Sequence, residues 1–209
     1  MVRLKCAFVA TAIAEYFKDC GKNVVLMMDS LTRFAMAQRE IGLATGEPPV
    51  ARGYTPSVYS LMPKLLERSG SFETGSITAL YTVLVEGDDV NEPISDTVRG
   101  ILDGHIVLSR AIAMRNHYPA IDILASISRV MNDIVDEEHL QLANSMREIL
   151  SVYYQNYDLI SIGAYKSGTN KKLDEAIDKI GKINEFLCQK RDAYFAFDST
   201  IEMMRQSLA

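Results

Sequence analysis

The chain has 209 residues, of which 48% are hydrophobic, so it can bury a core and is expected to form one or two domains. Its net charge of −5, from 22 basic and 27 acidic residues spread along the chain, gives no broad cationic face and argues against nucleic acid as a partner. Cys6, Cys20 and Cys188 show neither disulfide nor metal-ligand spacing, so we expect reduced thiols in a cytoplasmic protein.

The amino-terminal segment resembles a signal peptide but is better explained as a helix. Arg3 and Lys5 precede an apolar stretch ending in Ala-Ile-Ala at 12–14. Apolar residues continue at helical spacing to Phe17, and Gly21 is a natural helix stop. No later apolar run approaches the roughly 20 residues needed to span a bilayer, so any membrane association is expected to be peripheral.

Residues 24–28 form a short, continuous apolar run, the pattern of a strand covered on both faces. Asp29 follows at its carboxyl end. This is the geometry of a Walker B aspartate, which orients magnesium beside nucleotide phosphates, although an aspartate here is more often a helix N-cap. Ser30 is an equally good cap for the helix expected over 31–41.

The rest of the first 133 residues alternates between helix and strand. A loop rich in Gly and Pro over 42–56 leads to a helix over 57–68. Strands are expected over 76–85, 105–108 and 121–127, with an acidic turn at 86–89 and a short helix over 94–102. This alternation predicts an α/β fold with a largely parallel sheet.

Beyond residue 133 the pattern becomes helical, with isolated glycines between segments. Helices are expected over 138–158, 173–180, 183–191 and 195–208, which together form an all-α helical bundle. The sequence therefore predicts two domains, residues 1–133 and residues 134–209.

Six segments resemble type III secretion ATPases, a family of the rotary ATPase superfamily. They read DSLTRFAMAQRE at 29–40, GLATGEPP at 42–49, YTVLVEGDD at 81–89, DGHIVLSR at 103–110, HYPAID at 117–122 and ASISRV at 125–130. The resemblance extends in the same order from residue 2 to residue 189. It implies that residues 1–133 are the carboxyl-terminal part of a RecA-like ATPase domain. DTVRGIL at 96–102 favours the flagellar export branch, with an injectisome ATPase as the nearest alternative.

This resemblance assigns roles in binding ATP and magnesium. Asp29 corresponds to the Walker B carboxylate, which holds Mg²⁺ indirectly, and Arg33 to a residue that reaches the terminal phosphate; its alternative is a surface salt bridge. Tyr118 corresponds to the aromatic residue that stacks on adenine and is otherwise a core tyrosine. Arg129 corresponds to an arginine finger that enters the neighbouring subunit's site.

The family also implies an assembly and its partners. A finger acting across an interface requires an oligomer, which in the family is a homohexamer at the inner face of the cell membrane. Asp88, Asp89 and Glu92 correspond to loops that face a central stalk protein, although a solvated acidic turn explains them equally well. Further partners implied are export chaperones, their substrates and the export gate.

The sequence departs from the family in what it lacks. No glycine-rich loop ending in Gly-Lys-Thr or Gly-Lys-Ser occurs in these residues, and the catalytic glutamate and amino-terminal β-barrel of the family are also missing. We therefore expect the chain alone to be inactive, and its incomplete sheet to expose an apolar edge that lowers solubility. The alternative function is a non-catalytic module in which the bundle binds chaperones or the stalk.

Overall fold

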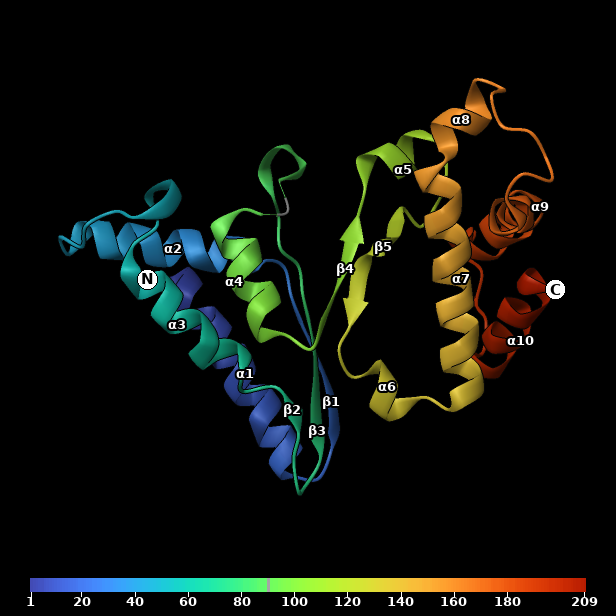
Figure 1. The fold of residues 1–209 in the computed structure, drawn as a ribbon. Helices are drawn as coiled ribbons and strands as arrows, with labels where there is room; N and C mark the ends of the chain where they lie inside the picture. Colours follow the sequence, from blue (N-terminus) through green and yellow to red (C-terminus); the bar gives the residue numbers. More distant parts are fainter. Residues whose placement is uncertain (90) are drawn as a thin grey trace. The chain divides into compact units, whose positions relative to one another are not determined.

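The structure is a computed structural model that describes residues 1–89 and 91–209, with all of their side chains except that of Asp88. It contains two compact units, Met1–Leu102 and Asp103–Ala209 (Figure 1). The α/β fold followed by helices confirms the predicted fold class.

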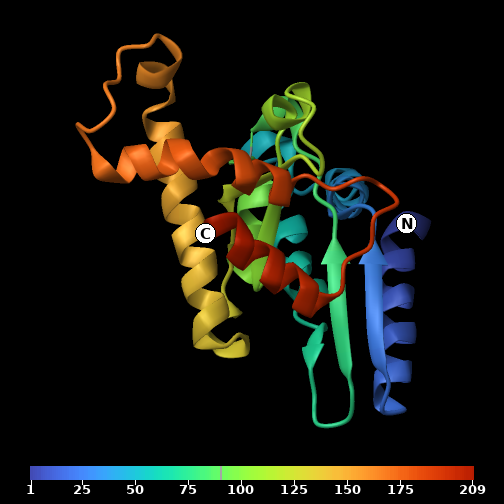
Figure 2. The same cartoon turned by 90° about the vertical axis from the view of Figure 1, so that its right-hand side faces the viewer.

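The first unit is a small sheet with helices. Its elements in chain order are α1 (Val2–Asp19), β1 (Asn23–Met28), α2 (Leu31–Ala44), η1 (Ala51–Gly53), α3 (Pro56–Leu66), β2 (Gly70–Ser71), β3 (Ser76–Tyr81), η2 (Glu86–Asp88) and α4 (Pro93–Ile101). The strand order is β1-β3-β2. β1 and β3 are parallel, with Met28 opposite Tyr81, and β2 is antiparallel to β3 (Figure 2).

α1 confirms the amino-terminal helix, but among its large apolar residues only Leu4 and Phe8 pack against the core. Its buried residues are Ala7, Thr11 and Ala14. Ile13 and Tyr16 are 53% and 65% exposed. Ala14 packs against Leu26 of β1 and Ile77 of β3, so a small side chain lies where the helix contacts the sheet.

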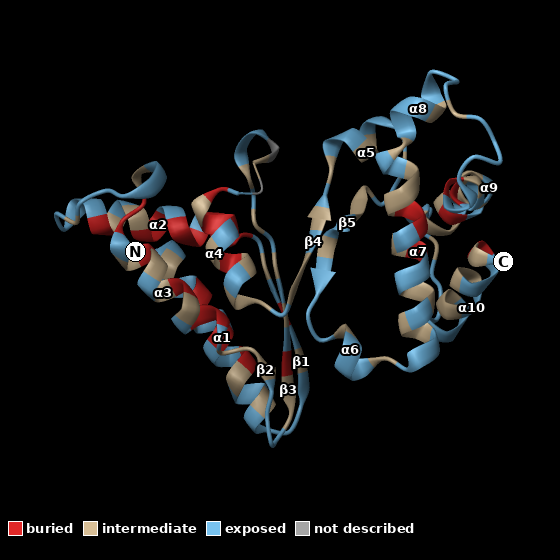
Figure 3. Cartoon of the chain, in the orientation of Figure 1, coloured by how far each residue is buried: buried red, intermediate tan, exposed pale blue. Residues whose placement is uncertain are grey.

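The core of the first unit lies among its helices rather than within the sheet. Figure 3 shows buried residues on the facing sides of α2, α3 and α4. Fully or almost fully buried members of this core are Leu31, Phe34, Val58, Met62, Leu65, Ile94 and Val98. Burying each such side chain stabilises the fold by roughly 1.5–3 kcal/mol, so this cluster is the main source of the unit's stability.

Only one face of the β1–β3 sheet is covered by described residues. Leu26 and Ile77 pack against Ala14 of α1. On the opposite face Val25 and Met27 are 65% and 75% exposed. The prediction that strand 24–28 is covered on both faces is therefore wrong for this chain, because α1 is the helix that packs on this sheet and it lies on one side.

The second unit combines a strand pair with a helical bundle. Its elements are β4 (Gly104–Leu108), α5 (Arg110–Met114), β5 (Ile121–Ser128), α6 (Met131–Ile134), α7 (Glu137–Gln155), α8 (Tyr157–Ser161), α9 (Lys171–Leu187) and α10 (Phe197–Leu208). β4 and β5 are antiparallel and form a separate two-stranded sheet. Among the described strand pairings only β1–β3 is parallel, so the sheet structure is more mixed than the alternation of elements indicates.

The bundle of α7, α9 and α10 confirms the helical carboxyl-terminal part. Met146, Ile149 and Leu150 of α7 pack against Ala176 and Ile183 of α9. The prediction of two helices separated at Gly181 is wrong, because α9 is continuous through this residue. A glycine inside a helix costs about 1 kcal/mol relative to alanine, and packing of α9 on α7 outweighs that cost.

Candidate functional site

Asp29 lies at the carboxyl edge of the parallel strands β1 and β3, where open α/β sheets bind their ligands. Thr82 follows β3 in the same register. Its Oγ1 donates a hydrogen bond to Asp29 Oδ1 at 2.8 Å, and its backbone N–H donates to the Met28 carbonyl at 3.1 Å. The carboxylate is exposed and held in position by the neighbouring strand.

Ser30, rather than Asp29, caps the helix that follows. Its Oγ accepts a hydrogen bond from the Arg33 N–H at 3.3 Å, and it is 4% exposed. Such a cap stabilises a helix by about 1 kcal/mol. Because Ser30 satisfies the helix terminus, the second oxygen of Asp29 is left for other contacts. This removes the N-cap alternative for Asp29.

Arg33 lies on the first turn of α2 with an exposed side chain. It forms no ion pair with any residue that the structure describes, so the surface salt bridge considered for it is not observed. Its position on the turn after Asp29 puts both side chains at the start of α2. An anion bound there would meet a cation and the amino end of a helix, both of which favour negative charge.

A second threonine, Thr32, holds the segment after β3 against α2. Its Oγ1 accepts from the Leu84 N–H at 2.8 Å and donates to the Leu84 carbonyl at 3.1 Å. The predicted strand over 76–85 ends at Tyr81, and these bonds take the place of strand pairing beyond it. Neither Thr82 nor Thr32 was singled out by the sequence analysis. The parallel register, once known, identifies Thr82 because it places residues 29 and 82 side by side.

Tyr118 and Arg129 belong to the second unit and both lie at its surface. Tyr118 is 53% exposed, which excludes the core-tyrosine alternative, and its carbonyl accepts from the Gln189 N–H at 2.8 Å. The segment that follows Gln189 carries Tyr194 and Phe197, which are 89% and 68% exposed. Arg129 is exposed, and its N–H donates to the Asp103 carbonyl at 2.7 Å.

The acidic turn at 86–89 is tied to the loop before α3. The Arg52 guanidinium pairs with Asp89, and its Nη1 lies 3.6 Å from Glu92 Oε2. Glu92 is only 5% exposed and accepts from the Glu86 N–H at 3.4 Å. The side chain of Asp88, predicted with these two residues, lies outside the described part of the structure. Asp89 and Glu92 are thus fixed by Arg52, and they remain a predicted stalk-facing site.

No group of three or more His, Cys, Asp or Glu side chains able to hold a metal ion occurs among the described residues. None of the described helices combines the length and apolar content needed to cross a bilayer. The described residues at the β1–β3 edge supply one carboxylate, that of Asp29, near the start of α2. Any cation bound there would need most of its ligands from a bound anion or from water.

Comparison with known families agrees with this geometry. Residues 1–128 match the family model of the ATP synthase alpha/beta family, nucleotide-binding domain. Residues 135–206 match the type III secretion system EscN ATPase C-terminal domain. The chain belongs to the ATP synthase alpha/beta family. The two matches leave a gap between residues 128 and 135, whereas the compact units divide at Leu102, and the domain boundary at 133 stays a prediction.

Relatives similar to the chain include flagellar and secretion proteins. It is 61% identical over 192 residues to a flagellum-specific ATP synthase of Bacillus subtilis, which covers 92% of this chain and 44% of the relative. It is 56% identical over 202 residues to a type 3 secretion system ATPase of Xanthomonas euvesicatoria, covering 97% of this chain and 46% of that relative. The chain thus spans about half the length of the curated relatives it matches.

Solved structures give the same result for the fold. The assembled ATPase EscN of enteropathogenic E. coli superposes with a TM-score of 0.96 at 51% identity, over 99% of this chain and 50% of EscN. EscN in complex with its central stalk EscO matches with a TM-score of 0.90 at 50% identity, over 99% of this chain and 49% of EscN. At this identity the likeness extends to sequence as well as fold.

Proposed function

We propose that the chain is part of an ATPase that energises flagellar type III protein export. The family membership and the flagellum-specific relative at 61% identity support this, with the injectisome ATPases at 56% as the alternative branch. Because the chain spans about half of these relatives, hydrolysis is proposed for the whole protein rather than for these residues alone.

The observation that carries the proposal is the environment of Asp29. The carboxylate lies at the carboxyl edge of a parallel strand pair, is oriented by Thr82 and is released from helix capping by Ser30. A Walker B carboxylate needs these conditions: a fixed direction, access to the ligand and a free oxygen. Magnesium would be bound through water and nucleotide phosphates, with Asp29 orienting it.

Arg33, Tyr118 and Arg129 complete the proposed nucleotide site. All three are exposed, as residues that contact a ligand or a neighbouring subunit must be. Arg33 contacts the terminal phosphate, Tyr118 stacks on adenine, and Arg129 acts as the arginine finger of the adjacent subunit. The assembly is a homohexamer, and the assembled state of EscN supports an oligomer.

The remaining parts of the proposal concern partners and place. Asp89 and Glu92, held by Arg52, form with Asp88 a loop that faces a central stalk, and the EscN–EscO complex supports such a partner. Export chaperones, their substrates and the export gate are further partners. The protein acts in the cytoplasm at the inner face of the membrane, with residues 1–133 as the nucleotide-binding part and 134–209 as the bundle.

The experiment joins these 209 residues to the part of the B. subtilis relative that they do not match, and measures ATP hydrolysis. The 209 residues alone lack a phosphate-binding loop and should show no turnover. In the joined protein, Asp29→Asn or Arg129→Ala should each lower the rate by on the order of a thousandfold.

Mixing the two inactive variants tests whether the finger acts between subunits. In a randomly mixed ring about one interface in four pairs an intact Asp29 with an intact Arg129, so about a quarter of the wild-type rate should return. A mixture as inactive as its components would refute an interfacial site. If the 209 residues capture an export chaperone and the joined protein shows no turnover, the non-catalytic module is the correct function.

A further inference from the structure

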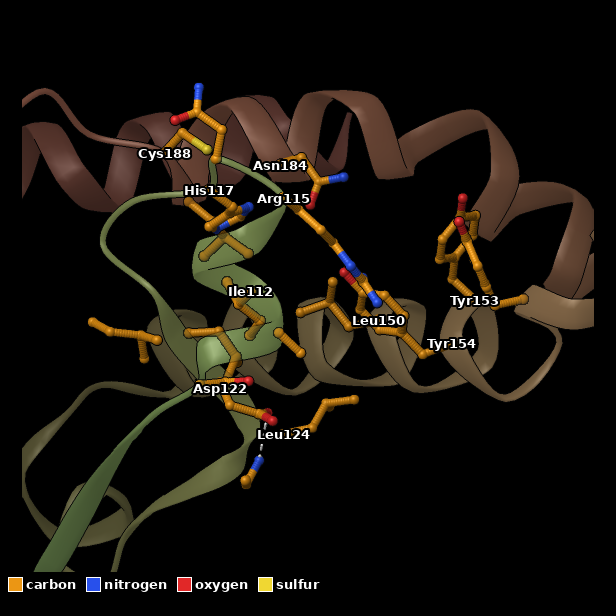
Figure 4. Close-up of a pocket in the computed structure, with 18 residues that line it drawn as sticks. Ile112, Arg115, His117, Asp122, Leu124, Leu150, Tyr153, Tyr154, Asn184 and Cys188 are labelled. Atoms are coloured by element: carbon orange, nitrogen blue, oxygen red, sulfur yellow. Dashed lines mark hydrogen bonds between the residues drawn. The ribbon is translucent and has the colours of Figure 1, made fainter. Parts of the chain in front are cut away.

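The second unit contains a pocket that the proposed nucleotide site does not use. Its volume is about 670 Å³, within the roughly 300–1,000 Å³ typical of small-molecule sites. The pocket is open to solvent on one side and is lined by α5, the first half of β5, the carboxyl half of α7, the start of α8 and the end of α9 (Figure 4). Neither Tyr118 nor Arg129 lines it.

The walls of the pocket are mainly aliphatic. Ile112 of α5, Ile123 and Leu124 of β5, Leu150 of α7 and Leu187 of α9 all line it. Leu150 is 2% exposed and belongs to the core of the bundle, so this wall is fixed by packing rather than by a mobile loop. Such a surface favours an apolar ligand through the area that binding removes from water.

One end of the pocket combines aromatic rings with a cation. The guanidinium carbon of Arg115 lies 6.0 Å from the ring centre of Tyr154 and 5.9 Å from that of Tyr157. Tyr153 packs edge-to-face on both rings, and burial raises the pKa of its hydroxyl. Arg115 forms no ion pair with the residues described. Both distances lie near the roughly 6 Å limit of a cation–π contact, and no described residue gives the guanidinium an anionic partner.

The opposite end carries the pocket's only carboxylate among the described lining residues, that of Asp122. Asp122 Oδ1 accepts from the Ala125 N–H at 2.9 Å, which occupies one of its oxygens within β5. Figure 4 shows Arg115 running towards Leu150 and Tyr154, and Asp122 nearer to Leu124. A phosphate or other polyanion would meet one cation and one opposing carboxylate, so a single negative charge at the tyrosine end fits best.

We propose that this pocket binds a small aromatic monocarboxylate, with its ring between the aliphatic walls and its carboxylate on Arg115. The bidentate geometry of guanidinium and carboxylate sets the ligand's direction. Binding would tie α5 and β5 to α7 and α9 within the second unit. The site is separate from nucleotide binding and does not depend on the proposed ATPase activity.

The test uses 2-naphthoate as the probe and its neutral isostere 2-naphthamide as the matched ligand, with affinities measured by titration calorimetry on the full chain. Naphthoate should bind at least about tenfold more tightly than naphthamide, a difference of about 1.4 kcal/mol, because its carboxylate accepts charge-assisted hydrogen bonds from Arg115. Arg115→Gln should remove this preference and leave naphthamide binding unchanged. Arg3→Gln, which removes an exposed arginine from α1, should change neither affinity.

Cys188 reports where the probe sits, because it lines the pocket and is exposed, as are Cys6 and Cys20 in the first unit. Naphthoate should slow alkylation of Cys188 by iodoacetamide and leave the other two cysteines unaffected, as measured by peptide mass spectrometry. Equal protection of all three, or equal naphthoate affinity in Arg115→Gln, would overturn the proposal. Should Arg115→Gln fail to fold, Ala111→Phe, which fills the pocket from an exposed position on α5, must abolish protection of Cys188.

Discussion

Replacing Gly42 with alanine should destabilise the first unit, although alanine is the better helix former. Gly42 lies in α2, and a Cβ built there would be 2.4 Å from Thr55 Oγ1 and 2.9 Å from Thr55 Cβ. Thr55 is fully buried and its Oγ1 lies 3.1 Å from Ser57 Oγ, so it has little room to move. Overpacking of this kind costs about 1–3 kcal/mol.

The matched control is Gly100→Ala in α4 of the same unit, where an added Cβ meets no atom of the described residues within 4 Å. Both substitutions gain the helix propensity of alanine, about 1 kcal/mol, so their difference isolates the clash with Thr55. Gly100→Ala should raise the free energy of unfolding of the first unit, and the free energy of unfolding of Gly42→Ala should lie about 1–3 kcal/mol below the Gly100→Ala value.

Urea unfolding followed by circular dichroism gives both free energies. Thr55→Ala completes a double-mutant cycle, because it removes Thr55 Oγ1, the atom nearest to the added Cβ at position 42. Thr55→Ala should therefore cost less stability in the Gly42→Ala background than in the wild type. If Gly42→Ala proves as stabilising as Gly100→Ala, the close approach of α2 to Thr55 is not as described and the reasoning fails.

Three further outcomes are expected. Ser30→Ala should lower the free energy of unfolding by about 1 kcal/mol in urea titrations, because it removes the helix cap. Ser30→Thr keeps the hydroxyl, so its free energy of unfolding should lie close to that of the wild type. The hydrogen bond from Arg68 lowers the pKa of Glu15 below its ordinary 4.5. The interaction between Glu15 and Arg68 therefore contributes its full stability above pH 4.5, and this stability is lost as the pH falls through the folded-state pKa of Glu15. Arg68→Gln should therefore differ from the wild type by less than about 1 kcal/mol near pH 7, because both groups are part-exposed, and the two thermal midpoints should converge on acidification. In the joined ATPase, Thr82→Val should lower kcat by about tenfold through loss of the hydrogen bond that orients Asp29, and an unchanged kcat would mean that this bond is not needed.

The local pattern was sufficient for the elements around the candidate site. An apolar run followed by Asp29 predicted a strand ending in an accessible carboxylate, and the structure places β1 and Asp29 accordingly. Ser30 and Asp29 were equivalent as caps in sequence terms. Only the geometry separates them, because capping depends on which side chain reaches the Arg33 N–H.

Contacts between distant segments were not predictable from a single sequence. Thr82 became a site residue through the register of β1 and β3, and Glu92 proved to be buried beside Arg52, 40 positions earlier in the chain. The helical spacing of apolar residues in α1 likewise predicted an amphipathic helix. It did not show which of these apolar residues the rest of the fold would bury.

By itself, the sequence determined the family, the α/β-then-helical order of elements and the candidate chemistry at Asp29, because these depend on local residue patterns. Tertiary structure decided the antiparallel β4–β5 pair, the continuity of α9 through Gly181 and the pocket around Arg115. Strand pairing, helix continuity and cavities all depend on packing between segments far apart in the chain, and packing energies there exceed the local preferences that a sequence pattern records.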